Sequence, residues 1–347
     1  MNVGPPVLLR CDGFHDIGLG HVARCLALAE ELKTRRNCRV TFAMRNGTLG
    51  MEVVRREGYP VAAPDEVGER FDYSAWMLDV IGKAGARAVV LDVRDDLPRG
   101  ALDDARRRGI LIVTIDDPSD RRLAADLAFY PPVPQLHRMK WEGFTGKLYS
   151  GWEWVVLRKE FADRPPRITG TRPCVLVTMG GSDPGGITLK AVSALDLLVE
   201  DFETVVVLGR GFSGDAALNE LLAGTRRSCR VLRDVSDMAG VLSQADVAVA
   251  SFGVTAYELA ALGVPAIHVC LTEDHAISAG MFEKEGLAIN LGSYSTVSPG
   301  DIAVAVQELI HDPGKRDAMG NAGRLRVDGR GSERIVNLIA DGCRAGK

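Results

Sequence analysis

A histidine at the start of a predicted helix is the clearest candidate for acid–base chemistry in this sequence. His21 follows the strand-like run 7–11 and the glycines Gly18 and Gly20, which allow a tight turn and close approach to a ligand. The positive end of the helix dipole disfavours an imidazolium, so a neutral His21 could accept a proton near pH 7. Arg24, three residues further on, lies on the same helical face. The alternative is that His21 only caps the helix and that Arg24 is a solvated charge.

Two other strand-to-helix loops could bind a phosphate through backbone N–H groups. Residues 180–186 contain four glycines but no Gly-Lys-Ser/Thr, so they are not a P-loop. The alternative for this segment is an ordinary flexible turn. Residues 251–259 end the most apolar strand-like run and begin a helix. The candidate nucleotide-binding residues of the two loops are Gly180, Gly181, Ser182, Asp183, Ser251, Gly253, Val254, Thr255 and Glu258.

Three carboxylates stand out by their position. Glu258 interrupts an apolar stretch and could accept both hydroxyls of a ribose. Its alternative role, complementing the helix dipole, is worth about 0.3–1 kcal/mol. Asp116 and Asp117 end a strand-like run and could bind a metal or sugar hydroxyls, or only cap the next turn. Because the chain has no Asp-x-Asp and no clustered His/Cys ligands, we expect neither a metal nor another cofactor.

Alternating strands and helices must position these loops, and they predict an α/β protein. The expected strands are the apolar runs at 7–11, 38–44, 87–92, 110–116, 174–179, 204–208, 229–232, 247–251, 265–270 and 287–292. We expect two doubly wound Rossmann-like domains that face each other across a cleft, with the chemistry beyond the carboxyl ends of the strands. The charged, proline-containing segment 158–173 favours a boundary there, and the alternative is one large α/β domain. The expected parts are an N-terminal domain at 1–160, a linker at 161–173, a C-terminal domain at 174–330 and a C-terminal helix at 331–347.

The composition excludes several classes of protein. The 347 residues carry a net charge of −4 without a lysine-rich block, so we expect no nucleic-acid partner. No apolar run reaches the roughly 18 residues that span a bilayer, which argues against stable membrane insertion. No secretory signal is visible at the N-terminus. The seven cysteines, an odd number without Cys-x-x-Cys, indicate reduced thiols in a cytoplasmic protein.

Several short motifs, taken in order, resemble the PseG/SpsG-type nucleotide-sugar hydrolases. The best-known member of that family removes UDP from a diacetamido-trideoxy hexose in pseudaminic acid synthesis, and the family is similar to the two-domain GT-B glycosyltransferases. The resemblance covers nearly the whole chain. It is carried by Arg10-Cys11-Asp12, Ile17–Arg24, Leu91-Asp92, Ile115-Asp116-Asp117, Gly151–Trp154, Leu157–Phe161, Met179–Asp183, Thr255–Leu259 and Leu262–Pro265.

The resemblance implies a role for each part. His21 would be the general base that activates water to attack the anomeric carbon with inversion, and Asp12 would orient the sugar or the His21 ring. The leaving nucleoside diphosphate, expected to be UDP, would lie at Gly253 and near 180–183, with Glu258 on the ribose. Helix N-termini and arginines would stabilise the leaving charge without a metal. The remaining residues expected to bind substrate are Gly20, Arg24, Asp92, Asp116 and Asp117.

The sequence also departs from the family at positions expected near the sugar. Arg94 replaces an aromatic residue, and Asp274-His275 replaces Asn-Gln. These three residues are therefore expected to bind a more polar sugar, unless Arg94 turns outward to pair with Asp95 or Asp96. The expected partner is a nucleotide sugar, and the expected assembly is a monomer or a weak homo-oligomer. An inverting glycosyltransferase, a non-catalytic nucleotide-sugar-binding protein and a hydrolysing epimerase remain as alternatives.

Overall fold

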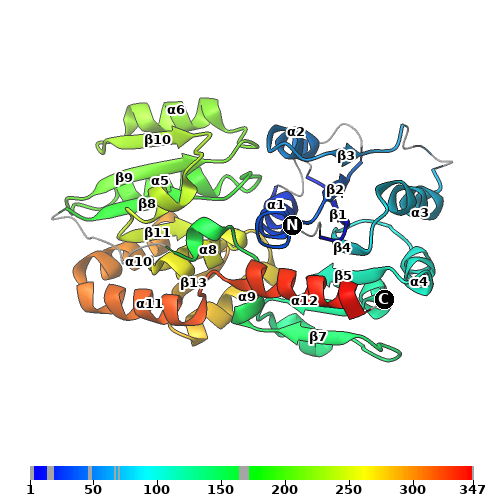
Figure 1. The fold of residues 1–347 in the computed structure, drawn as a ribbon. Coiled ribbons are helices and arrows are strands. Elements are labelled where there is room, and N and C mark those ends of the chain that lie inside the picture. The colour runs from blue at the N-terminus through cyan, green and yellow to red at the C-terminus, as the bar shows by residue number, and fades with distance from the viewer. Residues whose placement is uncertain are drawn as a thin grey trace. The chain divides into compact units, whose positions relative to one another are not determined.

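Two parallel sheets, each in its own unit of the chain, form the framework of the protein (Figure 1). The structure is a computed structural model, and it describes residues 4–13, 19–45, 49–65, 68, 71–163 and 172–345. Unit 1 comprises Met1–Lys159 and Arg330–Lys347, and unit 2 comprises Glu160–Gly329.

Unit 1 contains a seven-stranded sheet in the order β3-β2-β1-β4-β5-β6-β7. Its strands are β1 (Val7–Cys11), β2 (Val40–Ala43), β3 (Val61–Ala62), β4 (Ala88–Asp92), β5 (Leu111–Ile115), β6 (Leu127–Tyr130) and β7 (Lys147–Ser150). Its helices are α1 (Gly20–Arg36), α2 (Leu49–Arg56), α3 (Tyr73–Ala84), α4 (Arg99–Arg107) and α12 (Gly331–Ala345). Short 3-10 turns lie at Asp120–Ala124, Pro134–Arg138, Trp152–Trp154 and Lys159–Phe161.

Unit 2 contains a six-stranded sheet in the order β10-β9-β8-β11-β12-β13. Its strands are β8 (Cys174–Thr178), β9 (Glu203–Leu208), β10 (Cys229–Arg233), β11 (Val247–Ala250), β12 (Ala266–Cys270) and β13 (Ala288–Ser293). Its helices are α5 (Ile187–Asp196), α6 (Asp215–Gly224), α7 (Met238–Leu242), α8 (Val254–Leu262), α9 (Glu273–Lys284), α10 (Pro299–His311) and α11 (Pro313–Arg326).

The two sheets share one winding. Every strand pair in both sheets is parallel. When the strands of each unit are counted along the chain, the first strand lies between the second and the fourth: β1 lies between β2 and β4, and β8 lies between β9 and β11. The order therefore reverses between β1 and β4 and again between β8 and β11, which is where ligands of such sheets bind. This confirms the predicted pair of doubly wound domains. Three strands, β3, β6 and β7, were not predicted from the sequence. β3 has only two residues, and β7 is a largely exposed edge strand without a continuous apolar run.

Buried apolar residues explain why the strands form where the sequence predicts them. All five residues of β1 and of β4 are buried, as expected for strands covered on both faces. The core of unit 1 continues into α12, where Ile335, Val336 and Ile339 are fully buried. The C-terminal helix therefore completes unit 1, although the whole of unit 2 precedes it in sequence.

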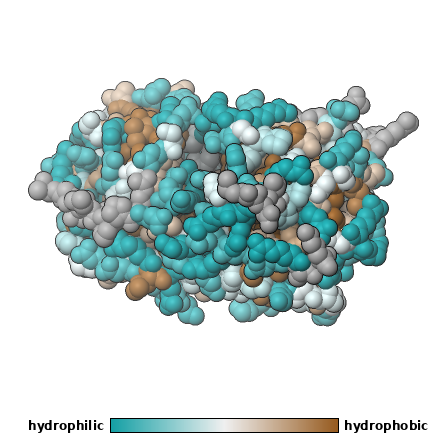
Figure 2. Space-filling view, in the orientation of Figure 1, coloured by the Kyte–Doolittle hydropathy of each residue, from teal (hydrophilic) through white to brown (hydrophobic). Residues whose placement is uncertain are grey.

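The surface is mainly hydrophilic on the face shown in Figure 2, with hydrophobic residues in small separate patches. Within the described ranges, no helix combines the length and the apolar content needed to cross a membrane. All seven cysteines are free thiols, and six of them are buried.

Candidate functional site

His21 lies against the end of the neighbouring strand β4. It is the second residue of α1, and its Nδ1 is 2.6 Å from Oδ1 of Asp92, the last residue of β4. Arg24, one helical turn further on, donates to both oxygens of the same carboxylate, from Nε to Oδ2 and from Nη2 to Oδ1, each at 2.7 Å. The two chain segments meet because β1, which leads into α1, pairs directly with β4.

This geometry determines which ring nitrogen of His21 carries the proton. Asp92 is completely buried, and although burial alone would raise its pKa, Arg24 and then His21 hold that pKa below its ordinary value. An ionised carboxylate only accepts hydrogen bonds, so His21 donates its Nδ1–H to Asp92. The 3.0 Å approach of Arg24 Nη2 to the same Nδ1 is then a close contact rather than a hydrogen bond. With the Nδ1–H donated to Asp92, Nε2 is the ring nitrogen that can accept a proton when the ring is neutral.

A small cavity adjoins His21, and we call it the His21 pocket. Its volume is about 150 Å³, and it lies at the carboxyl ends of β1, β2 and β4. Its lining residues are Asp12, His21, Arg45, Val93, Arg94, Asp95 and Asp96. The side chain of His21 is 12% exposed, so its neighbours hold the ring without enclosing it completely.

A fully buried arginine binds two of the carboxylates that line the His21 pocket. Arg10, in β1, donates to Asp12 at 2.5 Å and to Asp95 at 2.7 Å, and its Nε reaches the hydroxyl of Tyr73 at 2.7 Å. Arg121 holds the other oxygen of Asp95 at 2.9 Å. The two inner carboxylates are therefore neutralised from behind and kept in fixed positions.

The structure gives three predicted site residues a different role. Asp12 binds Arg10 and the backbone N–H of Arg45, so Asp92 rather than Asp12 orients the His21 ring. Asp92 and Arg24, which were expected to bind substrate, bond to each other, and Asp92 also bonds to His21. The physical reason is burial: a completely enclosed carboxylate needs a cation and hydrogen-bond donors from the protein itself.

The acidic pair at the end of β5 divides into two roles. Asp117 is 1% exposed, binds Arg121 at 3.0 Å and accepts from Ser119, so its carboxylate has partners within the protein itself. Asp116 accepts from Nη2 of Arg94 at 2.9 Å, and Arg94 lines the His21 pocket. Arg94 therefore pairs with neither of its sequence neighbours. Gly20, the remaining predicted substrate residue of unit 1, is the first residue of α1.

In unit 2, the two predicted phosphate loops converge beside the point where the strand order reverses. One follows β8 and the other follows β11, which pair directly. A methyl group placed on Gly180 would lie 3.9 Å from the Thr255 hydroxyl oxygen, so the two loops approach each other closely. Gly180 has a φ of +77°, and a side chain on Gly209 would meet the Gly180 carbonyl oxygen at 2.1 Å. Both glycines are needed for this turn to form.

The first turn of α8 has the features of an anion site. Gly253 precedes the helix, no side chain caps it, and the space above the Gly253 Cα is open. The N–H groups of Val254 and Thr255 lie in this first turn, where the helix dipole favours negative charge. Glu258, the fifth residue of α8, is 8% exposed.

The other predicted residues of unit 2 differ in position and role. Asp183 accepts from the N–H groups of Ile187 and Thr188 at 2.9 and 2.7 Å, so its carboxylate binds the start of α5. The carbonyl oxygen of Gly181, in the same loop, accepts a hydrogen bond from the N–H of Gly211 at 2.8 Å. Ser182 and Ser251 are both half-buried. Ser182 lies beside Gly211, and the backbone N–H of Ser251 donates to the carbonyl oxygen of Thr178 in β8. Asp274 and His275 lie in the first turn of α9, with the His275 ring 6.2 Å from Phe252.

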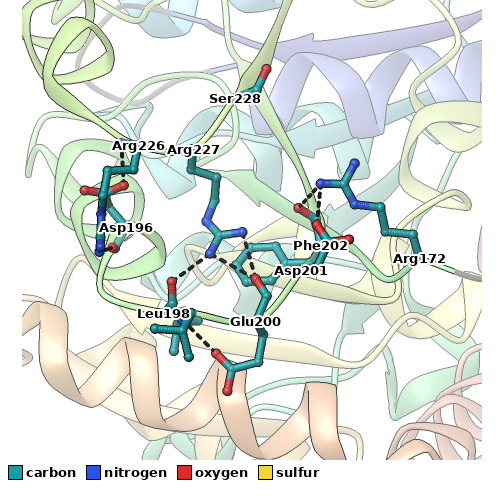
Figure 3. A pocket seen from close by; sticks show the side chains of 10 residues that line it. Arg172, Asp196, Leu198, Glu200, Asp201, Phe202, Arg226, Arg227 and Ser228 are labelled. Carbon is teal, nitrogen blue, oxygen red and sulfur yellow. Dashed lines mark hydrogen bonds and ion pairs between the residues drawn. The ribbon is translucent and has the colours of Figure 1, made fainter.

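A larger hollow in unit 2 lies at the opposite, amino ends of the strands. It encloses about 400 Å³ and is lined by Arg172, Asp196, Leu198–Phe202 and Arg226–Ser228. Figure 3 shows its central guanidinium turned onto the protein: Arg227 donates to the carbonyl oxygens of Leu198 and Glu200 and lies 3.7 Å from the centre of the Phe202 ring. Its cation is used to hold the loop before β9, so this hollow has the character of structural packing.

The sequence analysis missed the residues that support the His21 pocket. Arg10 is part of the motif Arg10-Cys11-Asp12, but no role was predicted for it. Arg45, Tyr73 and Arg121 were not predicted as site residues. Arg45 and Arg121 follow strands, which is the only local signal that could have marked them. Among the described residues, no group of three His, Cys, Asp or Glu side chains is arranged to hold a metal ion.

Comparison with known proteins extends over the whole chain. No protein-family model matches it. The chain is 23% identical to the spore coat polysaccharide biosynthesis protein SpsG of Bacillus subtilis, with 98% of both chains covered. It is also 30% identical over 175 residues to the UDP-N-acetylglucosamine–N-acetylmuramyl-(pentapeptide) pyrophosphoryl-undecaprenol N-acetylglucosamine transferase of Bordetella parapertussis, covering 49% of this chain and 47% of that one.

Solved structures show the same fold at low sequence identity. MurG of Acinetobacter baumannii has a TM-score of 0.71 at 18% identity, with 97% of this chain and 99% of that chain covered. The UDP-GlcNAc 2-epimerase of Neisseria meningitidis, solved bound to UDP-GlcNAc, has a TM-score of 0.63 at 12% identity, with 96% and 100% covered. The protein therefore has the GT-B fold, and its resemblance to the PseG/SpsG-type family is confirmed along the whole chain.

Proposed function

We propose that the protein hydrolyses a nucleotide-activated sugar, releasing a nucleoside diphosphate and a free sugar. The observation that carries this proposal is the arrangement of Arg24, Asp92 and His21, in which Asp92 binds Nδ1 of the ring and leaves Nε2 available on a side chain that lines a pocket. A group held in this way is suited to take a proton from water.

The proposed reaction is one inverting displacement. Nε2 of His21 removes a proton from water while the oxygen of that water bonds to the anomeric carbon. The bond from this carbon to the diphosphate oxygen breaks, and its electron pair leaves with the diphosphate. The imidazolium that forms is stabilised by Asp92, and Arg24 keeps that carboxylate in place.

The diphosphate is assigned to the loops of unit 2. Backbone N–H groups at the start of α8 and the turn at Gly180 supply fixed donors for the leaving charge. Glu258 is assigned to the ribose hydroxyls. Because these donors are backbone groups, we expect turnover to persist in EDTA.

A glycosyltransferase is the second candidate, and the similarity to a curated N-acetylglucosamine transferase over half the chain favours it. The same base would then remove a proton from an acceptor hydroxyl instead of water. The fold alone does not separate the two reactions, since the solved structures of this fold include transferases and epimerases.

The test is to incubate the pure protein with a panel of UDP-, dTDP- and GDP-sugars and to identify both products. Hydrolysis predicts equal amounts of nucleoside diphosphate and free sugar, with the inverted anomer visible by NMR before mutarotation. His21→Asn should lower kcat by roughly 10²–10⁴ with nucleotide binding retained.

Other results would point elsewhere. Slow nucleotide release that accelerates only with an added sugar or lipid acceptor would establish transfer. Release of a sugar epimerised at C2 would establish a hydrolysing epimerase. Binding without turnover across the panel would contradict catalysis altogether.

A further inference from the structure

Arg94 is a charged group at the pocket that the proposed reaction does not use. It lies two residues after β4 and lines the His21 pocket. Its only bonded partner among the described residues is Asp116, at 2.9 Å, and its side chain is 33% exposed. A guanidinium has five N–H donors, so one bond to the half-buried carboxylate of Asp116 leaves donors for a ligand.

The backbone of Asp116 indicates that this pair is held in place. Asp116 has a φ of +51°, which is the left-handed region that residues with side chains rarely adopt. Its N–H donates to the carbonyl oxygen of Phe129 at 2.8 Å, which ties the position to β6. Such conformations persist where the surrounding structure holds them, and they are concentrated at ligand sites.

The other charges around the pocket are already balanced. Asp12 and Asp95 are neutralised from behind by Arg10 and Arg121, as described above. Arg45 pairs with the exposed Asp96. Of the two arginines that line the pocket, Arg45 therefore pairs with another lining residue, whereas Arg94 pairs with Asp116, which does not line the pocket.

The lining offers little to an apolar substituent. Val93 is the single apolar side chain among the seven residues that line the pocket. A methyl group of a deoxy sugar would gain little apolar contact there. It would also displace water from the Arg94 guanidinium without accepting a hydrogen bond in its place. An oxygen atom on the sugar would accept a hydrogen bond from the guanidinium instead.

We propose that Arg94 is a specificity-determining residue that donates to an oxygen-bearing substituent of the sugar, so that the substrate carries a carboxylate or hydroxymethyl group where a 6-deoxy sugar carries a methyl. This inference rests on the proposed function, because it takes the His21 pocket to be the sugar site. A carboxylate and a hydroxyl share the same hydrogen-bond-accepting chemistry, and the experiment distinguishes them.

The experiment measures binding by calorimetry for three sugars that differ at one substituent. The probes are the UDP and dTDP derivatives of glucuronic acid, glucose and 6-deoxyglucose, with UDP and dTDP alone as references. The wild-type protein should bind the carboxylate or hydroxymethyl member about tenfold to a hundredfold more tightly than the methyl member, as a hydrogen bond to a charged donor implies.

Two variants and a control isolate Arg94. Arg94→Met should abolish this preference while the affinity for the free nucleoside diphosphate stays unchanged, and Arg94→Lys should restore part of it. Arg107→Met removes another arginine of unit 1 that pairs on the surface with Asp104, and it should change nothing. Thermal unfolding of each variant confirms that the fold is intact.

The failure of this inference differs from failure of the proposed function. Equal affinities for the three sugars, tighter binding of the methyl member, or a preference that survives Arg94→Met overturns the role of Arg94 and leaves the nucleotide assignment standing. A wild-type protein that binds neither the free nucleotides nor any of the six probes overturns the proposed function, and this inference falls with it.

Discussion

At the scale of single residues, the position of Asp92 matters more to the proposed chemistry than its chemical type. It is one of several aspartates at or just beyond the carboxyl ends of strands of unit 1, yet it is completely buried and bonded to both His21 and Arg24. Asp12, which a sequence motif also marks, is bonded to Arg10 instead. The two carboxylates lie at the carboxyl ends of the adjacent strands β1 and β4. Their roles differ because Asp12 binds Arg10, whereas Asp92 binds Arg24 and His21.

Replacing Asp92 with Asn should impair catalysis without removing the nucleotide loops. The amide can donate to Nδ1 and so stabilise the wrong tautomer, with the proton on Nε2, which would lower kcat by roughly 10²–10⁴. Steady-state kinetics and calorimetry with the nucleoside diphosphate check this. Asp79→Asn, at an exposed carboxylate of α3, is the matched control. A variant that folds and keeps its full kcat would contradict the orienting role.

His268 gives a prediction about pH and stability. Burial lowers its pKa to about 4 from an ordinary value of 6.5, and its ring is packed against Phe252 and Phe282. The unfolded chain therefore takes up a proton between about pH 6.5 and 4, whereas the folded protein does not. Stability from this residue is complete above about pH 6.5 and falls as the pH is lowered through that window.

The variant His268→Phe should remove this part of the acid sensitivity. Between pH 7 and 5 its free energy of unfolding should fall by about 2 kcal/mol less than that of the wild type. Urea unfolding at the two pH values measures the difference, with the exposed His137→Phe as the control. Parallel losses in wild type and variant would show that His268 is not responsible.

At the scale of elements, the same feature recurs in both units. The loops that follow the first and fourth strands of each sheet meet where the strand order reverses. In unit 1 this juxtaposition brings His21 to Asp92, and in unit 2 it brings Gly180 to Thr255. The parallel winding therefore generates both the proposed base and the proposed phosphate site.

The start of α8 can be tested with a single methyl group. Gly253 has an extended backbone with a φ of 171°, and a Cβ there would meet no atom within 4 Å. Gly253→Ala should therefore leave the melting temperature nearly unchanged but lower the affinity for a nucleoside diphosphate at least about tenfold, because the methyl group occupies the space of the phosphate.

The matched control for this variant is Gly224→Ala, at the end of α6, where a Cβ also meets no atom within 4 Å. It should affect neither stability nor binding. Calorimetric titration with UDP and dTDP gives the affinities. If Gly253→Ala binds both nucleotides as tightly as the wild type, the phosphate does not lie over this helix start.

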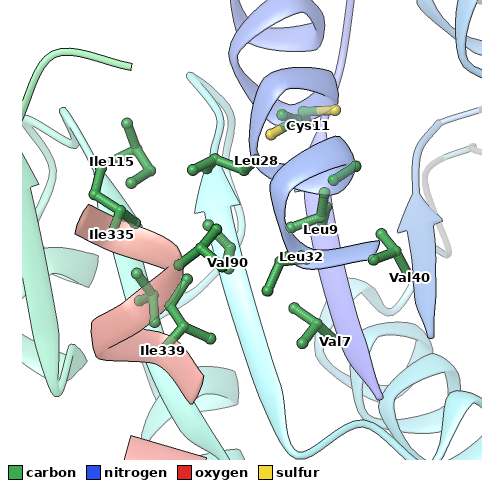
Figure 4. Close-up of a cluster of buried hydrophobic side chains, with 14 of the residues drawn as sticks. Val7, Leu9, Cys11, Leu28, Leu32, Val40, Val90, Ile115, Ile335 and Ile339 are labelled. Atoms are coloured by element: carbon green, nitrogen blue, oxygen red, sulfur yellow. The ribbon is translucent and has the colours of Figure 1, made fainter. Parts of the chain in front are cut away.

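At the scale of the whole molecule, the chain returns to unit 1 after completing unit 2. Figure 4 shows Ile335 and Ile339 of α12 among the buried side chains of β1, β4, β5 and α1. Arg36, near the end of α1, also reaches Asn337 of α12, with a donor–acceptor distance of 2.5 Å. Folding of unit 1 therefore depends on residues at the other end of the chain.

Ile339→Ala measures this dependence. The side chain is fully buried, so its truncation should lower the free energy of unfolding of unit 1 by roughly 2–5 kcal/mol. Val304→Ala, at a side chain that is 66% exposed, should change it by less than about 0.5 kcal/mol. Calorimetric unfolding compares the two. Equal, small effects would mean that α12 contributes little to unit 1.

Much of the architecture and several site positions follow from local sequence patterns. Continuous apolar runs predicted β1, β4, β5 and most strands of unit 2, because strands covered on both faces must be apolar throughout. Glycines and a histidine after such runs marked the loops of interest, because backbone freedom and helix starts leave a signature within a few residues. For these features the sequence by itself was sufficient.

Only the tertiary structure decided which charged groups are partners. Asp92 is 71 residues from His21, and Arg10 is 85 residues from Asp95, so no local pattern relates them. The same applies to Arg94, which bonds not to its sequence neighbours Asp95 and Asp96 but to Asp116, the residue that follows β5. Charge pairing is short-ranged in space but indifferent to sequence separation, and in a parallel sheet the strand order determines which loop ends meet.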